Sequence, residues 1–224
     1  MKVLQRNGQV IEGNFEQKEV REAFWHTSAH VLAQAVKRLY PDTQCAIGPA
    51  IENGFYYDFD FGFPFTEENL GDVEKEMRKI VKESLALEVY EVSEEEAIAY
   101  MKENGENWKL ELIEGLPEGE RISFYRQGDY AEFCAGPHIT NTSLIKAFKL
   151  LSIAGAYWRG DEHNKMLTRI YGISFPKARN WKNTLRSWGR RKPGTTESWE
   201  KSWGCLRLWK RGRDFRFSFR RGWC

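Results

Sequence analysis

The hydrophobic pattern of the first half of the chain predicts three helices. In each of them, apolar residues recur three or four positions apart, which places them on one face of a helix. Pro41 stops the first helix, Thr66 is a candidate N-cap for the second, and Ser93 with Glu96 forms a capping-box pattern at the start of the third. The helices are expected over residues 16–40, 66–85 and 93–105.

Short apolar runs between turn residues predict the strands. Asn7-Gly8 is a turn signal for a strand pair within residues 1–15, and Asn53-Gly54 is a second turn signal inside a candidate hairpin over residues 45–61. Helices that come early and strands that come late predict an α+β fold, with a two-layer, mainly antiparallel sheet packed on helices, and not alternating βαβ units. The remaining strands are expected over residues 55–59, 87–92, 109–113, 121–125, 148–153, 156–159 and 165–173.

Length and composition limit the class of protein. With 224 residues and 41% apolar content, the chain can bury one substantial core. No stretch approaches the roughly 20 uninterrupted apolar residues of a membrane span, and the charged N-terminus lacks the apolar run of a secretion signal. We therefore expect a cytoplasmic protein without a membrane partner. The cysteines show no regular spacing and are expected to be free thiols in that reducing compartment: Cys45, Cys134, Cys205 and Cys224.

The charge distribution divides the chain near residue 178. Residues 1–178 contain 20 of the 34 lysines and arginines and 29 of the 32 aspartates and glutamates, so residues 179–224 contain 14 and 3. Six of the nine tryptophans also lie in residues 179–224. We therefore expect an acidic, folded body followed by a strongly basic, Trp-rich tail.

Three of the four histidines and one cysteine form a pattern that carries chemistry. His26 and His30 are four residues apart, on one face of the first predicted helix, a spacing that by itself also fits a plain surface hydrogen bond. Cys134 and His138 flank a Gly-Pro turn that can bring the thiol and the imidazole together. Together the four residues are the ligand inventory of a zinc site, and without metal they can position water and transfer protons.

Several segments resemble, in the same order, the editing domain of bacterial threonyl-tRNA synthetases. They are residues 26–37 (HTSAHVLAQAVK), 46–49 (AIGP), 53–58 (NGFYYD), 134–138 (CAGPH), 155–161 (GAYWRGD) and 164–167 (NKML). The resemblance covers residues 23–176. It therefore implies an N-terminal stub over residues 1–22, an editing domain over residues 23–176 and a basic, Trp-rich tail over residues 177–224. A related module occurs in alanyl-tRNA synthetases and free-standing alanyl deacylases, but the flanking segments favour the threonyl family.

The resemblance implies hydrolysis of seryl-tRNA(Thr), with the acceptor end of tRNA(Thr) as the partner. Serine lacks only one methyl of threonine, and one methyl discriminates by about 1–3 kcal/mol, so a second sieve must remove the error. The implied chain is a truncated synthetase whose ATP-dependent ligase activity belongs to a missing catalytic domain, and the intact family forms homodimers. The alternatives are an inactive tRNA-binding fragment and a zinc-dependent alanyl-type deacylase. The threonyl family is expected to edit without a cofactor, whereas the alanyl relatives use the same four residue types to bind zinc.

The resemblance also implies roles for the four residues of the pattern. His26 and His30 are expected to activate or orient water, and Cys134 and His138 to hold the serine and the terminal adenosine. If zinc is bound instead, the same four residues are the expected ligands.

Further residues align with the family's pocket. Lys109, on a predicted strand, is expected to stabilise the oxyanion, with a solvated lysine at a strand end as the alternative. Glu132 stands where the family has Asp, and the extra methylene can move the carboxylate by roughly 1.5 Å. Substrate-binding roles are expected for Glu132, Tyr157 and Arg159. Tyr57 and Trp158 join them as candidates for stacking on terminal bases, with core packing as the alternative.

Codon arithmetic offers an explanation for the tail. In a shifted reading frame, the last base of each codon is read with the first two bases of the next. With suitable synonymous codons for residues 179–224, this frame encodes an amino-acid sequence that resembles the start of the family's catalytic domain. We interpret the tail as a frameshifted remnant that was not selected to fold with the rest of the chain. The alternative is a basic, aromatic tail that binds RNA.

Overall fold

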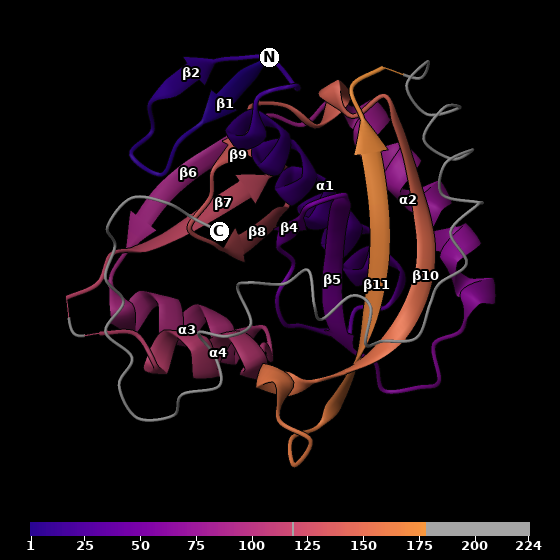
Figure 1. Ribbon diagram of the computed structural model, residues 1–224. Helices are drawn as coiled ribbons and strands as arrows, with labels where there is room; N and C mark the ends of the chain where they lie inside the picture. Colours follow the sequence, from indigo (N-terminus) through magenta and orange to yellow (C-terminus); the bar gives the residue numbers. More distant parts are fainter. Residues whose placement is uncertain (118, 178–224) are drawn as a thin grey trace.

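The computed structural model describes residues 1–117 and 119–177 (Figure 1). Apart from Lys177, the predicted basic tail lies outside the described residues, and its interpretation as a frameshifted remnant stays a prediction. The described part of the chain contains three antiparallel sheets and four α-helices, which confirms the predicted α+β class. Every helix in this part is too short or too polar to cross a bilayer.

The largest sheet has five strands. It consists of β10 (Ala147–Tyr157), β11 (Met166–Phe175), β5 (Gly54–Asp60) and β3 (Gln44–Cys45), in that order, with β4 (Ala50–Ile51) also paired to β5. A second sheet consists of β6 (Leu87–Val92), β7 (Ile122–Gln127) and β8 (Tyr130–Phe133). The third sheet consists of β2 (Val10–Glu12), β1 (Lys2–Leu4) and β9 (His138–Ile139), so a strand of the predicted N-terminal stub pairs with the strand that carries His138.

Helix α1 (Lys18–Leu39) is the centre of the molecule. Nearly all of its residues from Ala23 to Val36 are buried, which is possible because small and apolar residues occupy most of its faces. It packs against β5, where Phe55, Tyr57 and Phe59 alternate toward the core, and against α2 (Leu70–Glu83). Figure 1 shows α1 between the five-stranded sheet and the two smaller sheets.

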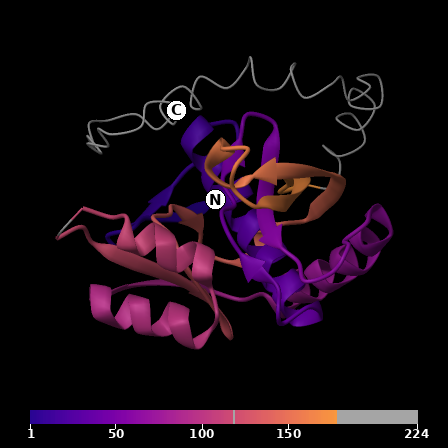
Figure 2. The same cartoon turned by 90° about the horizontal axis from the view of Figure 1, so that it is seen from below.

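Two short helices pack on the sheet formed by β6, β7 and β8. They are α3 (Glu94–Glu103) and α4 (Asn107–Glu114), and their apolar residues form a separate core with Ile122 and Phe124 of β7. The predicted capping box is confirmed, since the Ser93 hydroxyl accepts from the Glu96 amide and the Glu96 carboxylate accepts from the Ser93 amide. Figure 2 shows α3 and α4 on one side of the molecule and α2 on the other.

The strand prediction for residues 109–113 is wrong, because these residues form α4. Leu110 and Leu112 alternate with polar residues as in a strand, but the buried positions are Lys109 and Ile113, one helical turn apart. Leu, Glu and Lys are also good helix formers. In addition, the two strands predicted over residues 148–153 and 156–159 form one strand, β10, followed by a 3₁₀ turn (Trp158–Gly160).

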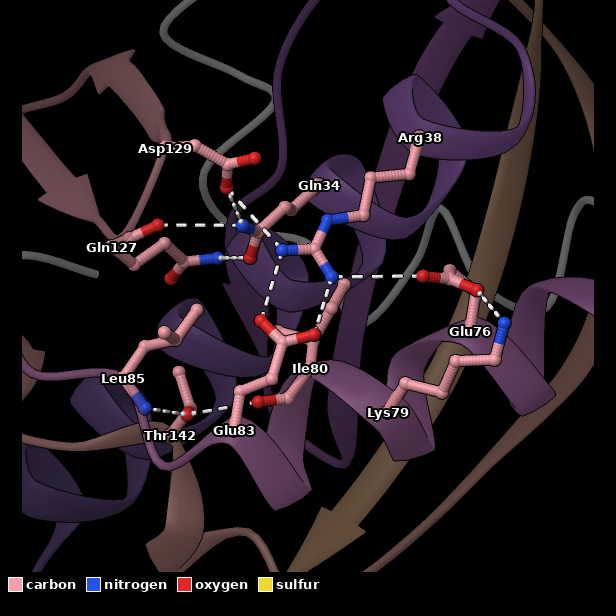
Figure 3. A network of polar contacts seen from close by, with 10 residues as sticks. All are labelled: Gln34, Arg38, Glu76, Lys79, Ile80, Glu83, Leu85, Gln127, Asp129 and Thr142. Atoms are coloured by element: carbon pink, nitrogen blue, oxygen red, sulfur yellow. Dashed lines mark hydrogen bonds and ion pairs between the residues drawn. The ribbon is translucent and has the colours of Figure 1, made fainter.

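A polar network joins α1, α2 and the turn between β7 and β8 (Figure 3). Arg38 of α1 forms ion pairs with Glu83 of α2 at 2.7 Å and with Asp129 of the turn at 3.3 Å. One turn earlier on α1, Gln34 donates to Asp129 at 2.9 Å and accepts from the Gln127 side chain at 2.9 Å. The network holds the β6–β8 sheet against the two helices of the main core.

Candidate functional site

The predicted constellation of three histidines and one cysteine is assembled in the structure. His26 and His30 come from one face of α1, Cys134 follows β8, and His138 begins β9. One donor atom from each of the four side chains lies within 4.8 Å of those of the others. Residues that are 108 positions apart in the chain therefore share one small site.

The turn between Cys134 and His138 depends on a glycine. Gly136 has a φ of +67°, and a Cβ added there would lie 2.0 Å from the hydroxyl oxygen of Tyr125. The Gly136 amide donates to the Cys134 sulfur at 3.2 Å. The ring of Tyr125 also packs on the ring of His138, with centroids 4.4 Å apart. Any larger residue at position 136 would disturb both the thiol and the tyrosine beside the histidine.

The Cys134 thiol lies between two imidazoles. Its sulfur is 3.2 Å from Nε2 of His26 and 3.4 Å from Nε2 of His138. The His138 ring centroid is 4.3 Å from that of His26 and 4.2 Å from that of His30. Among the described residues, Nδ1 of His30 is buried and has no hydrogen-bond partner.

A buried ion pair adjoins this cluster. The Lys109 ammonium on α4 pairs with the Glu132 carboxylate on β8, and both side chains are almost fully buried. The hydroxyls of Tyr57 and Tyr130 donate to the same carboxylate, and Nε2 of His30 lies 3.6 Å from it. Glu132 thus connects the lysine to the histidine cluster. The alternative of a solvated strand-end lysine is wrong, since Lys109 is buried and helical.

Burial keeps the cluster neutral at pH 7. It lowers the pKa of His26 to about 4, although the nearby Glu132 acts in the opposite direction. Burial, followed by the neighbouring imidazoles, also lowers the pKa values of His30 and His138 well below the usual range. Burial raises the pKa of the Cys134 thiol to about 12. The site therefore presents neutral rings and a protonated thiol, and no thiolate nucleophile.

Lys109 differs from the cluster in being charged. Burial alone would lower its pKa, but the adjacent Glu132 carboxylate and further acidic neighbours outweigh this effect, and the pKa is raised. The site therefore combines neutral hydrogen-bonding rings with a buried ion pair, whose ammonium can interact with negative charge that develops on a reacting oxygen.

Comparison with known proteins identifies the family. The model of the threonyl and alanyl tRNA synthetase second additional domain matches residues 122–171. The threonine–tRNA ligase of Caldanaerobacter subterraneus subsp. tengcongensis is 59% identical over 174 residues, which are 78% of this chain and 27% of the relative. The chain belongs to the threonyl-tRNA synthetase family.

Two further threonine–tRNA ligases show the extent of the similarity. That of Clostridium tetani is 63% identical over 163 residues, 73% of this chain and 26% of the relative. That of Clostridium novyi is 52% identical over 208 residues, 93% of this chain and 33% of the relative. The chain thus spans about a quarter to a third of the length of these threonyl-tRNA synthetases.

Two of the residues predicted to bind substrate lie outside the cluster. Tyr157 is 46% exposed at the end of β10, and Arg159 pairs with Glu111 of α4 at 2.9 Å. Figure 1 shows this turn at the far end of the molecule from β9, which carries His138. The position of the cluster thus does not support a direct contact of Tyr157 or Arg159 with the ester. The role of these two residues in binding stays a prediction.

Other residues have roles that differ from the expected ones or were not expected. Tyr57 and Trp158 are buried, as in the core-packing alternative; Tyr57 donates to Glu132, and Trp158 donates to Glu111. Sequence reasoning also missed Thr27, Tyr125 and Tyr130, which contact the cluster or its carboxylate. The only available signal for Thr27 was its place between the two histidines.

The donor set of the cluster fits a zinc ion. Imidazole and thiolate are common zinc ligands, and a tetrahedral site with bonds of about 2.0–2.3 Å places its nitrogen and sulfur atoms about 3.5 Å apart. The separations of 3.2 and 3.4 Å from the Cys134 sulfur to the two Nε2 atoms agree with that spacing. His26, His30, Cys134 and His138 would hold the ion, and Cys134 would have to lose its proton.

Proposed function

We propose that this chain carries an aminoacyl-tRNA deacylase site that hydrolyses seryl-tRNA(Thr). The observation that carries the proposal is the convergence of His26, His30, Cys134 and His138 within 4.8 Å beside a buried lysine. The need for a second sieve supports the proposal further. A site that joins threonine to tRNA cannot exclude serine fully on the basis of one missing methyl. Charged tRNA as substrate agrees with the cytoplasmic location expected from the sequence.

The proposed reaction is hydrolysis of an ester by an activated water. A neutral ring of His26 or His30 orients the water and accepts a proton as the water oxygen bonds to the ester carbonyl carbon. The charge that develops on the carbonyl oxygen is stabilised by the fixed ammonium of Lys109. The bond to the terminal ribose oxygen then breaks, and that oxygen receives the proton that the histidine had accepted, which gives serine and tRNA(Thr) and restores the neutral ring.

Cys134 and His138 have a binding role in this proposal. The thiol is protonated, so it acts as a hydrogen-bonding group and not as a nucleophile. Hydrolysis proceeds without a resident metal, and ligation of threonine to tRNA is not expected of these residues. A homodimer, as in the intact family, stays a prediction for this chain.

A deacylation assay on the full chain tests the proposal. Seryl-tRNA(Thr) should be hydrolysed in preference to threonyl-tRNA(Thr), and H26A and H30A should each lower the rate constant by about 100-fold or more. The matched control is H163A, because His163 is an exposed loop histidine outside the cluster. Hydrolysis at the parental rate in H26A and H30A would contradict the proposal, and tRNA binding without any turnover would favour an inactive binding module.

Zinc-dependent deacylation is the second candidate, favoured by the fit of the donor set to zinc. It predicts one zinc per chain by elemental analysis, loss of activity with a chelator, and recovery when zinc is added. Metal-free protein with full activity would reject this candidate and leave the metal-free mechanism in place.

A further inference from the structure

Thr27 lies between the two histidines of α1 and is completely buried. Its hydroxyl oxygen contacts three groups. It is 3.0 Å from the amide nitrogen of Ile139, 2.8 Å from the carbonyl oxygen of Ala23 and 3.1 Å from Nδ1 of His138. A side chain of the central helix thus contacts both residues of the short strand β9.

Counting protons at this hydroxyl assigns the donor in each contact. A hydroxyl has one proton and two lone pairs. The Ile139 amide can only donate, so it uses one lone pair, and the Ala23 carbonyl can only accept, so it uses the proton. One lone pair remains for His138. Nδ1 of His138 must therefore carry a proton and donate it to Thr27.

The position of this proton determines what His138 presents to the site. A neutral imidazole with its proton on Nδ1 has a lone pair on Nε2, and Nε2 of His138 faces the Cys134 sulfur at 3.4 Å. His26 follows the same pattern. It hydrogen-bonds the backbone of Pro137, which has only a carbonyl to offer, while its Nε2 faces the same sulfur at 3.2 Å.

We propose that Thr27 is a positioning residue of this site, which holds His138 in the Nδ1–H tautomer so that Nε2 accepts a hydrogen bond from the substrate or its attacking water. The Cys134 thiol has one proton and faces two Nε2 acceptors, so one of them stays open to a donor from outside the protein. The unpartnered Nδ1 of His30 is a further acceptor candidate. The site therefore takes a ligand group that donates hydrogen bonds, such as water or a primary ammonium. This inference rests on the proposed deacylase function only for its consequence on rate.

The tautomer can be tested without any activity. Proton–nitrogen correlation spectra of the full chain, labelled with ¹⁵N-histidine and assigned with the H138Q variant, report which ring nitrogen carries the proton. We expect a protonated Nδ1 and an unprotonated Nε2 for His138. A proton on Nε2 of His138 in the parent protein would overturn the inference, whatever the enzymatic rate.

Two variants of Thr27 test its role. T27V has nearly the same shape but no hydroxyl, whereas T27S keeps the hydroxyl. We expect the His138 spectrum to lose its single Nδ1–H form in T27V and to keep it in T27S. In the deacylation assay, T27V should lower kcat by about 10–100-fold with little change in KM, and T27S should restore most of it.

The possible outcomes separate the two proposals. An Nδ1–H tautomer that depends on the hydroxyl would support the role of Thr27, whatever the result of the deacylation assay. Failure of the parent protein to hydrolyse seryl-tRNA would contradict only the proposed function. Identical His138 spectra in T27V and the parent protein would overturn the role of Thr27, even if deacylation were confirmed. Should T27V fail to fold, the parental and T27S spectra still decide the tautomer.

Discussion

The pair of Lys109 and Glu132 is the only ion pair in contact with the histidine cluster within the described residues. The two side chains are almost fully buried, so each charge depends on the other to offset the loss of its water. Two tyrosine hydroxyls donate to the carboxylate and complete its hydrogen bonds. Glu132 therefore holds the Lys109 ammonium in place.

Removing one partner of this pair should lower the free energy of unfolding more than removing both partners. In E132Q the Lys109 ammonium loses the carboxylate that raises its pKa, and we expect the free energy of unfolding to fall by about 3–5 kcal/mol. K109M should lower the free energy of unfolding by a similar amount. The double variant should recover a large part of the loss, because no unpaired charge is left buried.

Urea denaturation of the four proteins at pH 7 measures this coupling. K102M, which removes an exposed lysine from α3, is the matched control for the loss of a positive charge. Strictly additive losses in the double variant would show that the two side chains do not stabilise each other.

The four residues of the cluster could be predicted from sequence to a large extent, but their surroundings could not. The spacings of His26 with His30 and of Cys134 with His138 indicate pairs of converging groups, and the structure brings all four together. The contacts of Glu132 with Tyr57 and of His138 with Thr27 join residues 75 and 111 positions apart. No local pattern encodes such a contact, because it depends on how β5, β8 and α1 pack.

Helix α4 is the element that delivers Lys109 to the site. At its start, the Glu106 carboxylate accepts from the Cys45 amide at 2.7 Å and pairs with Lys37 at 2.8 Å. Further along, Glu111 accepts from the indole of Trp158 at 3.0 Å. The helix is thus tied to α1, to β3 and to the β10–β11 turn, and these ties set the position of Lys109.

Loosening the start of α4 should affect both stability and the chemical step. In E106A the Cys45 amide and the Lys37 ammonium lose their acceptor, and we expect the free energy of unfolding to fall by about 2–3 kcal/mol. Because Lys109 is one turn away, kcat for deacylation should fall with little change in KM. E103A, at an exposed position of α3, is the control. A parental kcat in folded E106A would show that this tie does not position Lys109.

At the scale of elements, sequence patterns succeeded where one face is apolar and failed where a buried charged residue interrupts the pattern. The three predicted helices are present with shifted ends, and the Ser93 capping box is confirmed. The segment of α4 was misassigned because one of its two buried positions holds Lys109, a charged residue that periodicity counts as exposed. The burial of that lysine depends on a carboxylate 23 residues away.

On the scale of the whole molecule, the described residues form two principal cores, and polar contacts of α1 connect them. One contains α1, α2 and the five-stranded sheet, and the other contains α3, α4 and β7. The polar network around Arg38 crosses between them, because it ties α1 and α2 to the turn that joins β7 and β8 (Figure 3). The histidine cluster lies at this same junction, since it takes residues from α1 and from the chain after β8.

The Arg38 network should contribute to stability in a pH-dependent way. The hydrogen bond from Arg38 lowers the pKa of Glu83. Burial alone would raise the pKa of Asp129, but the hydrogen bonds that it accepts, first of all from Arg38, outweigh burial, so this pKa is lowered as well. A carboxyl group whose pKa is lower in the folded protein stabilises the fold above its unfolded pKa, near 4, and loses this effect as the pH falls through its folded pKa. R38M should therefore lower the free energy of unfolding by about 1 kcal/mol at pH 7 in low salt. The difference from the parent should shrink below about pH 4 and in 1 M salt.

Chemical denaturation of R38M and the parent protein at several pH values measures this difference. R126M is the matched control, because Arg126 forms a single, exposed ion pair with Glu88 at 2.7 Å, and its loss should change stability much less. Hydrogen exchange adds the location of the effect: amides of β7 and β8 should exchange faster in R38M, whereas those of β5 and β11 should not. A stability difference that stays constant from pH 7 to pH 3 would show that the Arg38 side chain acts through packing and not through its carboxylate partners.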